Sequence, residues 1–444
     1  MNIYKIQSAK FFFLQLFFFI FLLNPAIALN IIRDAEIEKL LKDYAEPLFK
    51  AANLRTENLN IVIVSDPSMN AFVTVSGKVF VYSGLLTQSR TPNEVIGVLA
   101  HEIGHITNGH AVTRRTQIDK ASLTSALALI AGLGVAAIGG TSDNKNMSQA
   151  GIGLTMGLTN SAKRNLLRYT RGQEYEADMA AVNILYKTGN STKGLINTLE
   201  LINRKSLVSA KYKNPYEQTH ASPPERISLI KSSAISSPYY NKTDSMKLLH
   251  RHNLVRAKLV AYLDYNTESI SRNNVYGQYI DVIRNFKKGA LKPALEKLNT
   301  LLQSDYNNPF YFELKGEILF QMNKSSEALE SLDNAIALAP EEKLILNKYA
   351  EILISTNIDK NIQEAIKILN ESIKHNSNNT EAYRQISIAY YKDNNIGLAE
   401  LNSAHLELLY GNKKQAKIFA KRAKNKLVYM SSHWMIADDI ESIN

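Results

Sequence analysis

Four alanines in the second half of the chain recur at nearly equal spacing. Ala294, Ala328, Ala365 and Ala399 are separated by 34, 37 and 34 residues. A period of this length fits a unit of two antiparallel helices that cross closely at a small residue. Such a unit cannot bury its apolar face alone, so neighbouring units must stack on one another. The spacing therefore favours a superhelix of helix pairs over residues 246–444.

The copy around Ala328 carries the fullest set of repeat positions. Gly316 and Ala328 are the small residues at the helix crossing, and Pro340 follows the second helix. This pattern is typical of tetratricopeptide (TPR) repeats, which bind peptides or partner proteins along a concave face. The alternative is a generic set of antiparallel helices with chance spacing. We expect a TPR-like helical repeat domain over 246–444 that serves recognition.

The first 28 residues have the order of a secretory signal peptide. Lys5 and Lys10 precede an apolar run over 11–23, and Ala26-Ile27-Ala28 offers a small-residue cleavage pattern. An uncleaved anchor helix is the alternative, but the run has about 13 residues whereas a membrane span needs about 20. We therefore predict that residues 1–28 are cleaved and that the mature chain is exported to the periplasm.

The segment between the signal peptide and the repeats mixes helical and strand patterns. Runs rich in β-branched and aromatic residues indicate strands, and Ser76-Gly77 within one of them indicates a hairpin turn. Apolar residues at helical spacing indicate helices. We expect an α+β catalytic domain with a small β-sheet over 29–245, in a chain that is mainly α. Its predicted elements are a helix over 35–52, a strand over 59–64, a hairpin over 71–82 and helices over 93–110 and 173–188.

One stretch of this segment, 121–142, carries no charged residue. Its length would suffice to span a membrane. Four glycines and scattered Ser and Thr would make insertion weak, however. We favour a loop-helix near the site, and association with a membrane surface stays open.

The sequence His101-Glu102-Ile103-Gly104-His105 is an HExxH motif at the end of an apolar helical run. Residues four apart share one face of a helix, so both imidazoles can reach one Zn²⁺ ion. Glu102 is rotated by about 100° from His101, beside the metal, where it can act as a general base. A solvated or hydrogen-bonded pair of histidines is the alternative, but burying these groups without a partner or a metal ion would cost several kcal/mol.

A catalytic zinc ion needs a third protein ligand and an open position. The chain has no cysteine, and the pattern HExxHxxGxxH is absent. His110 would project from the same helix about 180° away from the ligand face, so we expect it to be structural. Glu174 and Asp178 lie four apart on a predicted helix, where one could bind zinc and the other could hold a ligating histidine. A salt-bridged acidic surface turn is the alternative.

The HEIGH motif after an apolar helix, followed about 70 residues later by Glu174-Tyr175-Glu176-Ala177-Asp178, resembles the M48 peptidases, which are zinc proteases of the gluzincin type. The resemblance covers about 35–235. It implies that His101, His105 and Glu174 bind one Zn²⁺ ion per chain and that Glu102 is the catalytic base. It further implies that Asp178 supports a ligating histidine, with Glu176 as the competing carboxylate.

The segment 219–226 matches a later His…Arg segment of the same family. The resemblance implies that His220 lies by the metal, where it either stabilises the oxyanion or caps the open position as an autoinhibitory fourth ligand. Arg226 would orient that region or the acidic residues, and either His220 or Arg226 would act catalytically by offsetting the oxyanion charge. The sequence departs from the family at Ala221, where the family usually places Pro. An ordinary loop histidine is the alternative for His220.

With a signal peptide and C-terminal repeats, the resemblance implies an exported zinc metalloendopeptidase of envelope protein quality control. Its substrates would be misfolded or stalled envelope proteins, and its repeats would recruit substrate or assembly machinery. The implied partners are outer-membrane β-barrel proteins and their assembly machinery. One alternative is a chaperone-like TPR adaptor with a latent or structural zinc site. Another is a membrane-embedded peptidase anchored through 121–142.

The net charge of +11 is consistent with an anionic partner. Nucleic acid is a poor explanation in an exported protein. Two local groups of basic residues suit an anionic membrane or an acidic partner surface instead. One group, Lys163, Arg164, Arg168 and Arg171, precedes Glu174, and the other comprises Lys413, Lys414, Lys417, Lys421, Arg422, Lys424 and Lys426.

Overall fold

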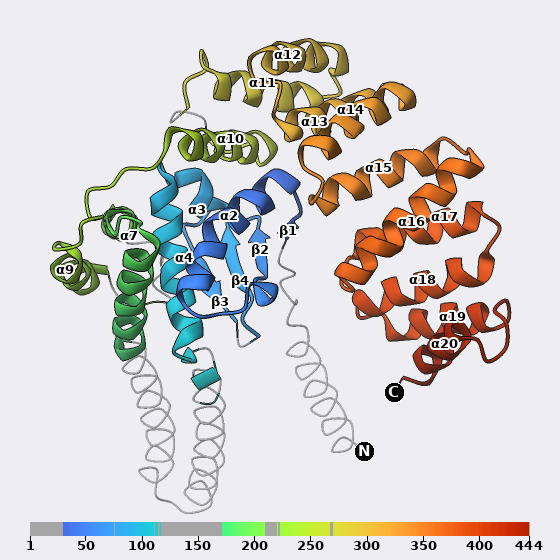
Figure 1. Ribbon diagram of the computed structural model, residues 1–444, viewed down its shortest axis with the longest axis horizontal. Helices are drawn as coiled ribbons and strands as arrows, with labels where there is room; N and C mark the ends of the chain where they lie inside the picture. Colours follow the sequence, from blue (N-terminus) through green and yellow to red (C-terminus); the bar gives the residue numbers. More distant parts are fainter. Residues whose placement is uncertain are drawn as a thin grey trace, which may run out of the picture.

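A computed structural model of the chain describes residues 30–443, apart from 75, 111, 114–115, 117–170, 209–219, 221–222 and 267–269. The fold is mainly α, with one small four-stranded sheet followed by a series of helix pairs (Figure 1). This confirms the predicted fold class. Among the described residues, no helix is both long and apolar enough to cross a membrane. The predicted signal peptide over 1–28 and the stretch 121–142 lie outside the described residues.

The sheet has the strand order β1-β2-β4-β3. Strand β2 pairs in parallel with β4, while β1 pairs antiparallel with β2 and β3 antiparallel with β4. The predicted hairpin is present as β3 and β4, and its turn uses Gly77 in the left-handed region, with φ 77°. Strand β3 therefore lies at one edge of the sheet. The bounds are β1 Ile31–Ile32, β2 Ile61–Val64, β3 Ala71–Val73 and β4 Val79–Tyr82.

In the described part of the chain, six helical segments pack on this sheet or on one another. Helix α2 begins after Asp34, whose side chain accepts a hydrogen bond from the Ile37 amide. Helix α4 is buried along almost its whole length, because α2, β3 and α7 all contact it. The segments are α2 Ala35–Ala51, α3 Ser83–Gln88, α4 Pro92–Thr107, helical residues 171–188, α7 Lys193–Val208 and α9 Pro223–Ala234.

Helix α4 ends three residues earlier than the sequence pattern predicts. Its last helical residue is Thr107, and Asn108 closes the helix. Gly109 then turns the chain, with φ 64° in the left-handed region. The predicted helix over 93–110 was wrong at this end, and the turn sends His110 in a new direction.

Helix α10, Met246–Tyr262, leads into five helix pairs that follow one another in an arc (Figure 1, yellow to red). The four recurring alanines lie on the second helices of the first four pairs, α12, α14, α16 and α18, and all four are buried. The repeat prediction is thereby confirmed. The helices are α11 Val275–Lys287, α12 Leu291–Ser304, α13 Pro309–Gln321, α14 Ser325–Leu338, α15 Lys343–Ser355, α16 Asp359–His375, α17 Thr380–Lys392, α18 Ile396–Leu409, α19 Lys413–Lys424 and α20 Ser432–Ser442.

Helix α10 contributes side chains to two hydrophobic cores. Val255 and Leu259 pack in the core of the sheet and its helices, whereas Ala257 and Val260 pack with the first repeats. The buried Lys258 between them forms ion pairs with Asp34 at 2.7 Å and Glu36 at 3.2 Å, just before and within α2. The repeats are thus joined to the first domain through shared packing and not through a linker alone. The domain limits given above from the sequence remain a prediction.

Candidate metal centre

The centre gathers seven buried side chains from three helices and one loop. Helix α4 supplies two histidines and a glutamate, and helical residues 171–188 supply two carboxylates. Helix α9 supplies the arginine, and the last histidine, His220, lies three positions before this helix begins. All seven are at most 5% exposed. The structure thus brings together every site residue that the sequence singled out: His101, Glu102, His105, Glu174, Asp178, His220 and Arg226.

Gly104, inside the HEIGH motif, sets the distance between the two main helices. A Cβ atom at this position would lie 2.7 Å from the carbonyl oxygen of Ala177 and 3.2 Å from the Cβ of Ala180. Real Cβ atoms do not come this close to a backbone oxygen. The absence of a side chain therefore lets α4 lie directly on helical residues 171–188, which carry Glu174 and Asp178.

The donor atoms of this centre have spacings that suit a tetrahedral metal ion. The Nε2 atoms of His101 and His105 lie 3.1 Å apart. The two carboxylate oxygens of Glu174 lie 3.3 Å from these two nitrogens, one from each. A tetrahedral site with metal–ligand bonds of about 2.0–2.1 Å has edges of about 3.3 Å. The three residues present therefore fit a zinc ion by donor type and by spacing.

His220 is a fourth potential donor in the same group. One ligand atom from each of His101, His105, Glu174 and His220 can be chosen so that all lie within 4.8 Å of one another. The Nδ1 atom of His220 is 3.0 Å from Glu174 Oε1. Its Nε2 atom is 3.3 Å from the carbonyl oxygen of Ala71 on β3 and 3.5 Å from Glu102 Oε1. His220 thus lies between the metal donors, the candidate base and the sheet edge.

Asp178 and Arg226 hold the first histidine in one orientation. The Nδ1 atom of His101 is 2.9 Å from Asp178 Oδ1, which leaves Nε2 directed at the donor group. Arg226 donates to both oxygens of Asp178, from Nε at 2.8 Å and from Nη2 at 2.7 Å. Its Nη1 is 2.9 Å from Glu174 Oε2. This single guanidinium therefore fixes the two carboxylates relative to each other.

His110 supports the second histidine, a contact that the sequence pattern did not predict. Its Nδ1 is 2.9 Å from Nδ1 of His105, and its Nε2 is 2.9 Å from Glu176 Oε2. A continuous helix would have placed His110 on the face opposite His105. The turn at Gly109 instead brings His110 into contact with His105. Glu176 is 61% exposed and stands at the outer end of this chain of contacts, outside the donor group. The dipeptide Asn108-Gly109, a usual helix end, was the signal that could have revealed this turn.

Burial and neighbouring charges shift the pKa values of these groups in different directions: those of His105 and the two carboxyls favour cation binding, whereas that of His101 favours a protonated ring. Burial lowers the pKa of His105 to about 3, so this ring is neutral. Burial also lowers the pKa of His101, but its hydrogen bonds to Asp178 and Glu174 outweigh this and raise it to about 9. Burial alone would raise the pKa of both carboxyls. The surrounding imidazoles instead hold the pKa of Glu174 well below its usual value, and Arg226 lowers that of Asp178.

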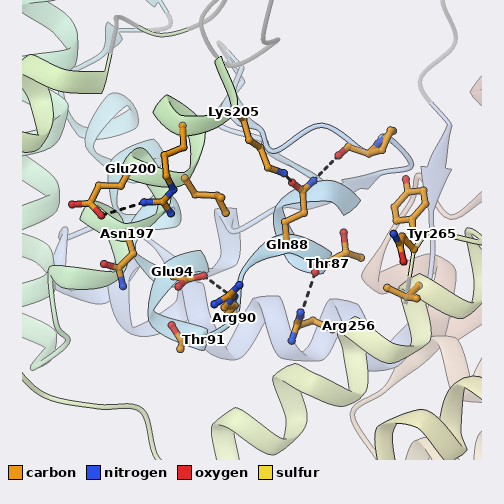
Figure 2. Close-up of a pocket in the computed structure, with 15 residues that line it drawn as sticks. Thr87, Gln88, Arg90, Thr91, Glu94, Asn197, Glu200, Lys205, Arg256 and Tyr265 are labelled. Carbon is orange, nitrogen blue, oxygen red and sulfur yellow. Dashed lines mark hydrogen bonds and ion pairs between the residues drawn. The ribbon is translucent and has the colours of Figure 1, made fainter. Parts of the chain in front are cut away.

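A cavity of about 800 Å³ lies elsewhere on the molecule, between α3, α4, α7 and α10 (Figure 2). None of the seven side chains of the centre lines it. Its charged residues contact their neighbours: Arg204 lies 3.7 Å from Glu200, and Lys205 donates to Gln88. The cavity is therefore separate from the candidate metal centre.

The sequence of residues 32–234 matches the profile described as peptidase family M48. The chain contains a peptidase M48 domain. Residues 295–409 match the profile of the cytochrome c-type biogenesis protein H TPR domain. The M48 domain therefore carries the HEIGH helix and both carboxylates of the centre, and the TPR profile falls on the helix pairs.

Named relatives match this chain over part or most of their own length. The β-barrel assembly-enhancing protease of Escherichia coli (strain K12) is 24% identical over 379 residues, which cover 82% of this chain and 74% of the relative. The protein of the same name in Yersinia pestis is 23% identical over 71% of this chain and 65% of the relative. The metalloprotease LoiP of Escherichia coli (strain K12) is 33% identical over 38% of this chain and 60% of the relative. A quarter or more of each relative is unmatched.

These matches give the enzyme class of the M48 domain. Its relatives are named proteases and metalloproteases, and M48 metalloproteases depend on a metal ion. The domain is therefore that of a metalloendopeptidase, as the resemblance implied. The close donor group of the centre gives a place where such a metal ion would bind.

Proposed function

We propose that this chain is an exported zinc metalloendopeptidase that hydrolyses peptide bonds of misfolded or stalled envelope proteins, outer-membrane β-barrel proteins among them. The observation that carries the proposal is the buried group of His101, His105 and Glu174 inside the M48 domain, with Glu102 beside it. The names of the β-barrel assembly-enhancing relatives support the substrate class. The predicted signal peptide supports a periplasmic location.

His101, His105 and Glu174 would hold one zinc ion, which supplies Lewis acidity to a carbonyl oxygen and makes water more acidic. Glu102 follows His101 on α4, and its Oε1 faces the same space, 3.5 Å from His220 Nε2. In the proposed reaction Glu102 accepts the proton of the attacking water and then returns it to the leaving amine. Its burial, at 1% exposure, keeps bulk water from competing for that proton.

Asp178 and Arg226 act as positioning residues in this proposal. Asp178 keeps the Nε2 lone pair of His101 directed inward, and Arg226 ties Asp178 to Glu174. Because the three guanidinium nitrogens of Arg226 all contact these two carboxylates, we assign it to holding the ligands and not to the oxyanion. That leaves His220 as the side chain placed to stabilise the oxyanion.

The edge of the sheet offers a place for an extended substrate. Strand β3 is an edge strand, and the carbonyl of its first residue, Ala71, lies next to His220. A peptide that adds to β3 as a further strand would run beside Glu102 and the donor group. Such a segment must be unfolded where it binds, which suits a protease that removes misfolded proteins.

Replacing Glu102 by Gln tests the reaction directly. The amide keeps the size of the side chain but cannot accept the proton, so we expect cleavage of a fluorogenic unstructured peptide to fall by about a hundredfold or more. Zinc content by elemental analysis and the circular dichroism spectrum should stay unchanged. Wild-type kinetics in the Glu102→Gln variant would contradict the assignment.

We propose one of two roles for His220: either it caps the open position as the fourth donor and keeps the centre latent, or it stabilises the oxyanion. If this histidine caps the open position, His220→Ala should raise peptidase activity several-fold while zinc content changes little. If His220 instead stabilises the oxyanion, the same variant should lose about tenfold or more in kcat. Peptide cleavage and zinc content measured on one preparation separate the two roles.

The TPR-like repeats are proposed to recruit substrate or the β-barrel assembly machinery, and the basic groups to give peripheral contact with a membrane. The TPR profile over 295–409 supports protein partners in general. A chaperone-like adaptor with a latent or structural zinc site is the remaining alternative. In cells that lack the protein, a Glu102→Gln variant that fully restores the envelope barrier to detergent would favour the adaptor over the protease.

A further inference from the structure

The loop between α19 and α20 exposes three consecutive apolar side chains. Val428, Tyr429 and Met430 are 78%, 73% and 59% exposed. The loop is nevertheless fixed at both ends. Before it, Leu427 packs on Gly397 of α18, so closely that a Cβ there would lie 2.9 Å from Leu427. After it, Ser431 caps α20 by accepting a hydrogen bond from the Trp434 amide. The exposure therefore belongs to an ordered loop.

The backbone of this loop is held in an unfavourable conformation. Met430 has φ 61°, in the left-handed region that long side chains rarely adopt. Asn or Gly would adopt this conformation at less cost. An outlier of this kind at an exposed apolar position points to a function for the side chain that is presented there.

Aromatic and cationic groups surround the exposed loop. The rings of Tyr429 and Trp434 meet edge to face, with centroids 4.9 Å apart. The ammonium group of Lys424 lies 4.7 Å from the centroid of the Trp434 ring. Met435 and Ile436, near the start of α20, add further exposed apolar surface. Tyr and Trp with a polar end and an apolar body are enriched where a protein meets the boundary of a bilayer.

The charges around the loop have one sign. Residues 412–437 contain seven Lys or Arg and no Asp or Glu. Lys414, Lys417 and Lys421 follow one another at helical spacing along one face of α19. Of the acidic residues that follow on α20, Asp438 and Glu441 both pair with Lys424. The surface beside the apolar loop is therefore strongly positive.

We propose that this surface, the α19–α20 tip, docks on an anionic phospholipid bilayer. The tip comprises the apolar loop Val428–Met430, Trp434 and the flanking cations Lys414, Lys417, Lys421, Arg422 and Lys426. A bilayer covers the apolar side chains and attracts the cations at the same time. An acidic peptide would satisfy the cations but leave three neighbouring apolar side chains in water. The inference makes the membrane contact proposed above specific and does not depend on the peptidase chemistry.

Trp434 is the single tryptophan of the chain, so its fluorescence reports on the tip alone. We would titrate the full mature protein with vesicles of equal parts phosphatidylglycerol and phosphatidylcholine, and with phosphatidylcholine alone. The emission should shift to the blue with the anionic vesicles, and lipids with brominated acyl chains should quench it. Added salt should weaken the binding, because the cations contribute through screened attraction.

Two variants with a matched control separate the parts of the tip. The first variant, Val428→Ser/Tyr429→Ser/Met430→Asn, replaces the three apolar side chains of the loop by polar ones. Asn is chosen at position 430 because it tolerates the left-handed backbone there. Lys414→Gln/Lys421→Gln/Lys426→Gln removes three charges, each contributing about a fivefold change in partition. Both should bind anionic vesicles about tenfold more weakly or worse. The control Lys360→Gln/Lys367→Gln/Lys374→Gln removes the same charge from α16 and should bind within about twofold of wild type.

The proposal would be overturned by an unshifted emission with anionic vesicles, by equal binding of the tip variants and wild type, or by the same shift with poly-glutamate. A shift that grows with protein concentration without lipid would assign the tip to a second copy and overturn it too. Cleavage of a soluble peptide, measured alongside, should be unchanged in both tip variants. Failure of lipid binding would thus leave the proposed peptidase activity standing, and loss of the latter would leave lipid binding intact.

Discussion

Glu174 and Glu176 are two residues apart on one helix, yet their surroundings are opposite. Glu174 is buried between His101, His105 and Arg226, whereas Glu176 is largely exposed and contacts His110. Since successive side chains on a helix are about 100° apart, two residues differ by about 200° and point to opposite faces. Only one of the two can therefore serve the metal centre directly.

This difference predicts unequal effects of the same substitution. Glu174→Gln removes a carboxylate that the centre needs, and we expect zinc affinity to fall by about a hundredfold or more. Glu176→Gln, the matched control, acts only through His110 and should cost about tenfold at most. Zinc competition with a chromogenic chelator measures both. Equal affinities in the two variants would contradict the ligand assignment.

At the scale of single residues, most of the candidate site could be predicted from the spacing of residues along the sequence. His101 with His105, and Glu174 with Asp178, could be paired because residues four apart share a helix face. His220 and Arg226 came only from the family resemblance, since no local spacing connects them to residues more than forty positions away. His110 was placed wrongly because the helix was extended through Asn108-Gly109, where the backbone turns instead.

The two helices of the centre form one packed unit. Gly104 on α4 touches the backbone of the helix that carries Glu174 and Asp178. Ligand spacing is therefore fixed by how closely two elements approach and not only by the ligands themselves. A second contact of this kind, between Gly97 and the backbone of Leu195, holds α4 against α7.

Adding one methyl group at Gly104 should disturb this unit. Gly104→Ala must move the facing helix away, so we expect a loss of about 1–3 kcal/mol in stability and about tenfold or more in zinc affinity. Gly172→Ala is the control, because a Cβ at that helical position meets nothing within 4 Å. It should leave zinc affinity unchanged and should not lower stability, because Ala is a better helix former than Gly. Thermal unfolding and zinc titration of both variants would check this, and intact zinc binding in Gly104→Ala would contradict it.

Elements with a strong periodic pattern were predicted well, and short ones were not. The hairpin of β3 and β4 and the repeat helices follow from alternation, turn residues and the alanine spacing. Strand β1 has two residues and α3 has six, so neither carries enough pattern to recognise. Their existence depends on pairing with β2 and on packing against α10, which are contacts made only in the fold.

On the scale of the whole molecule, α10 joins the two parts through buried polar groups. His252 of α10 contacts the Tyr44 hydroxyl through Nδ1 at 3.1 Å and donates from Nε2 to the Ser89 carbonyl at 3.0 Å. Both partners belong to the first domain. Lys258 forms an ion pair with Glu36, and the Tyr279 hydroxyl donates a hydrogen bond to the same carboxylate. Protonation at His252 would leave Nδ1 unable to accept from Tyr44.

This arrangement predicts a loss of stability in mild acid. Burial lowers the pKa of His252 to about 4, whereas an unfolded histidine has a pKa of about 6.5. The unfolded chain therefore binds more protons between these values, so stability is complete above about pH 6.5 and falls as the pH drops toward about 4. Between about pH 7 and about pH 5 this residue should account for about 2 kcal/mol.

Urea unfolding at the two pH values, compared between wild type and His252→Gln, isolates this contribution. Gln keeps a donor for the Ser89 carbonyl but does not titrate, and all other groups act equally in both proteins. We expect the loss of stability between the two pH values to be about 2 kcal/mol smaller in the variant. Equal losses in the two proteins would rule out His252 as the cause.

The double role of α10 also limits how such proteins can be recombined. One helix completes the apolar interior on both sides of the junction, and its lysine neutralises carboxylates at the start of α2. In a chimera whose repeats are exchanged by a cut before α10, the core of the sheet and its helices would lose the side chains of α10 and become exposed. Glu36 would also lose its ion pair with Lys258. A cut after α10 would instead uncover the first repeat. The M48 domain and the helix pairs therefore depend on each other, and sequence changes on either side of α10 must be compatible with the other side.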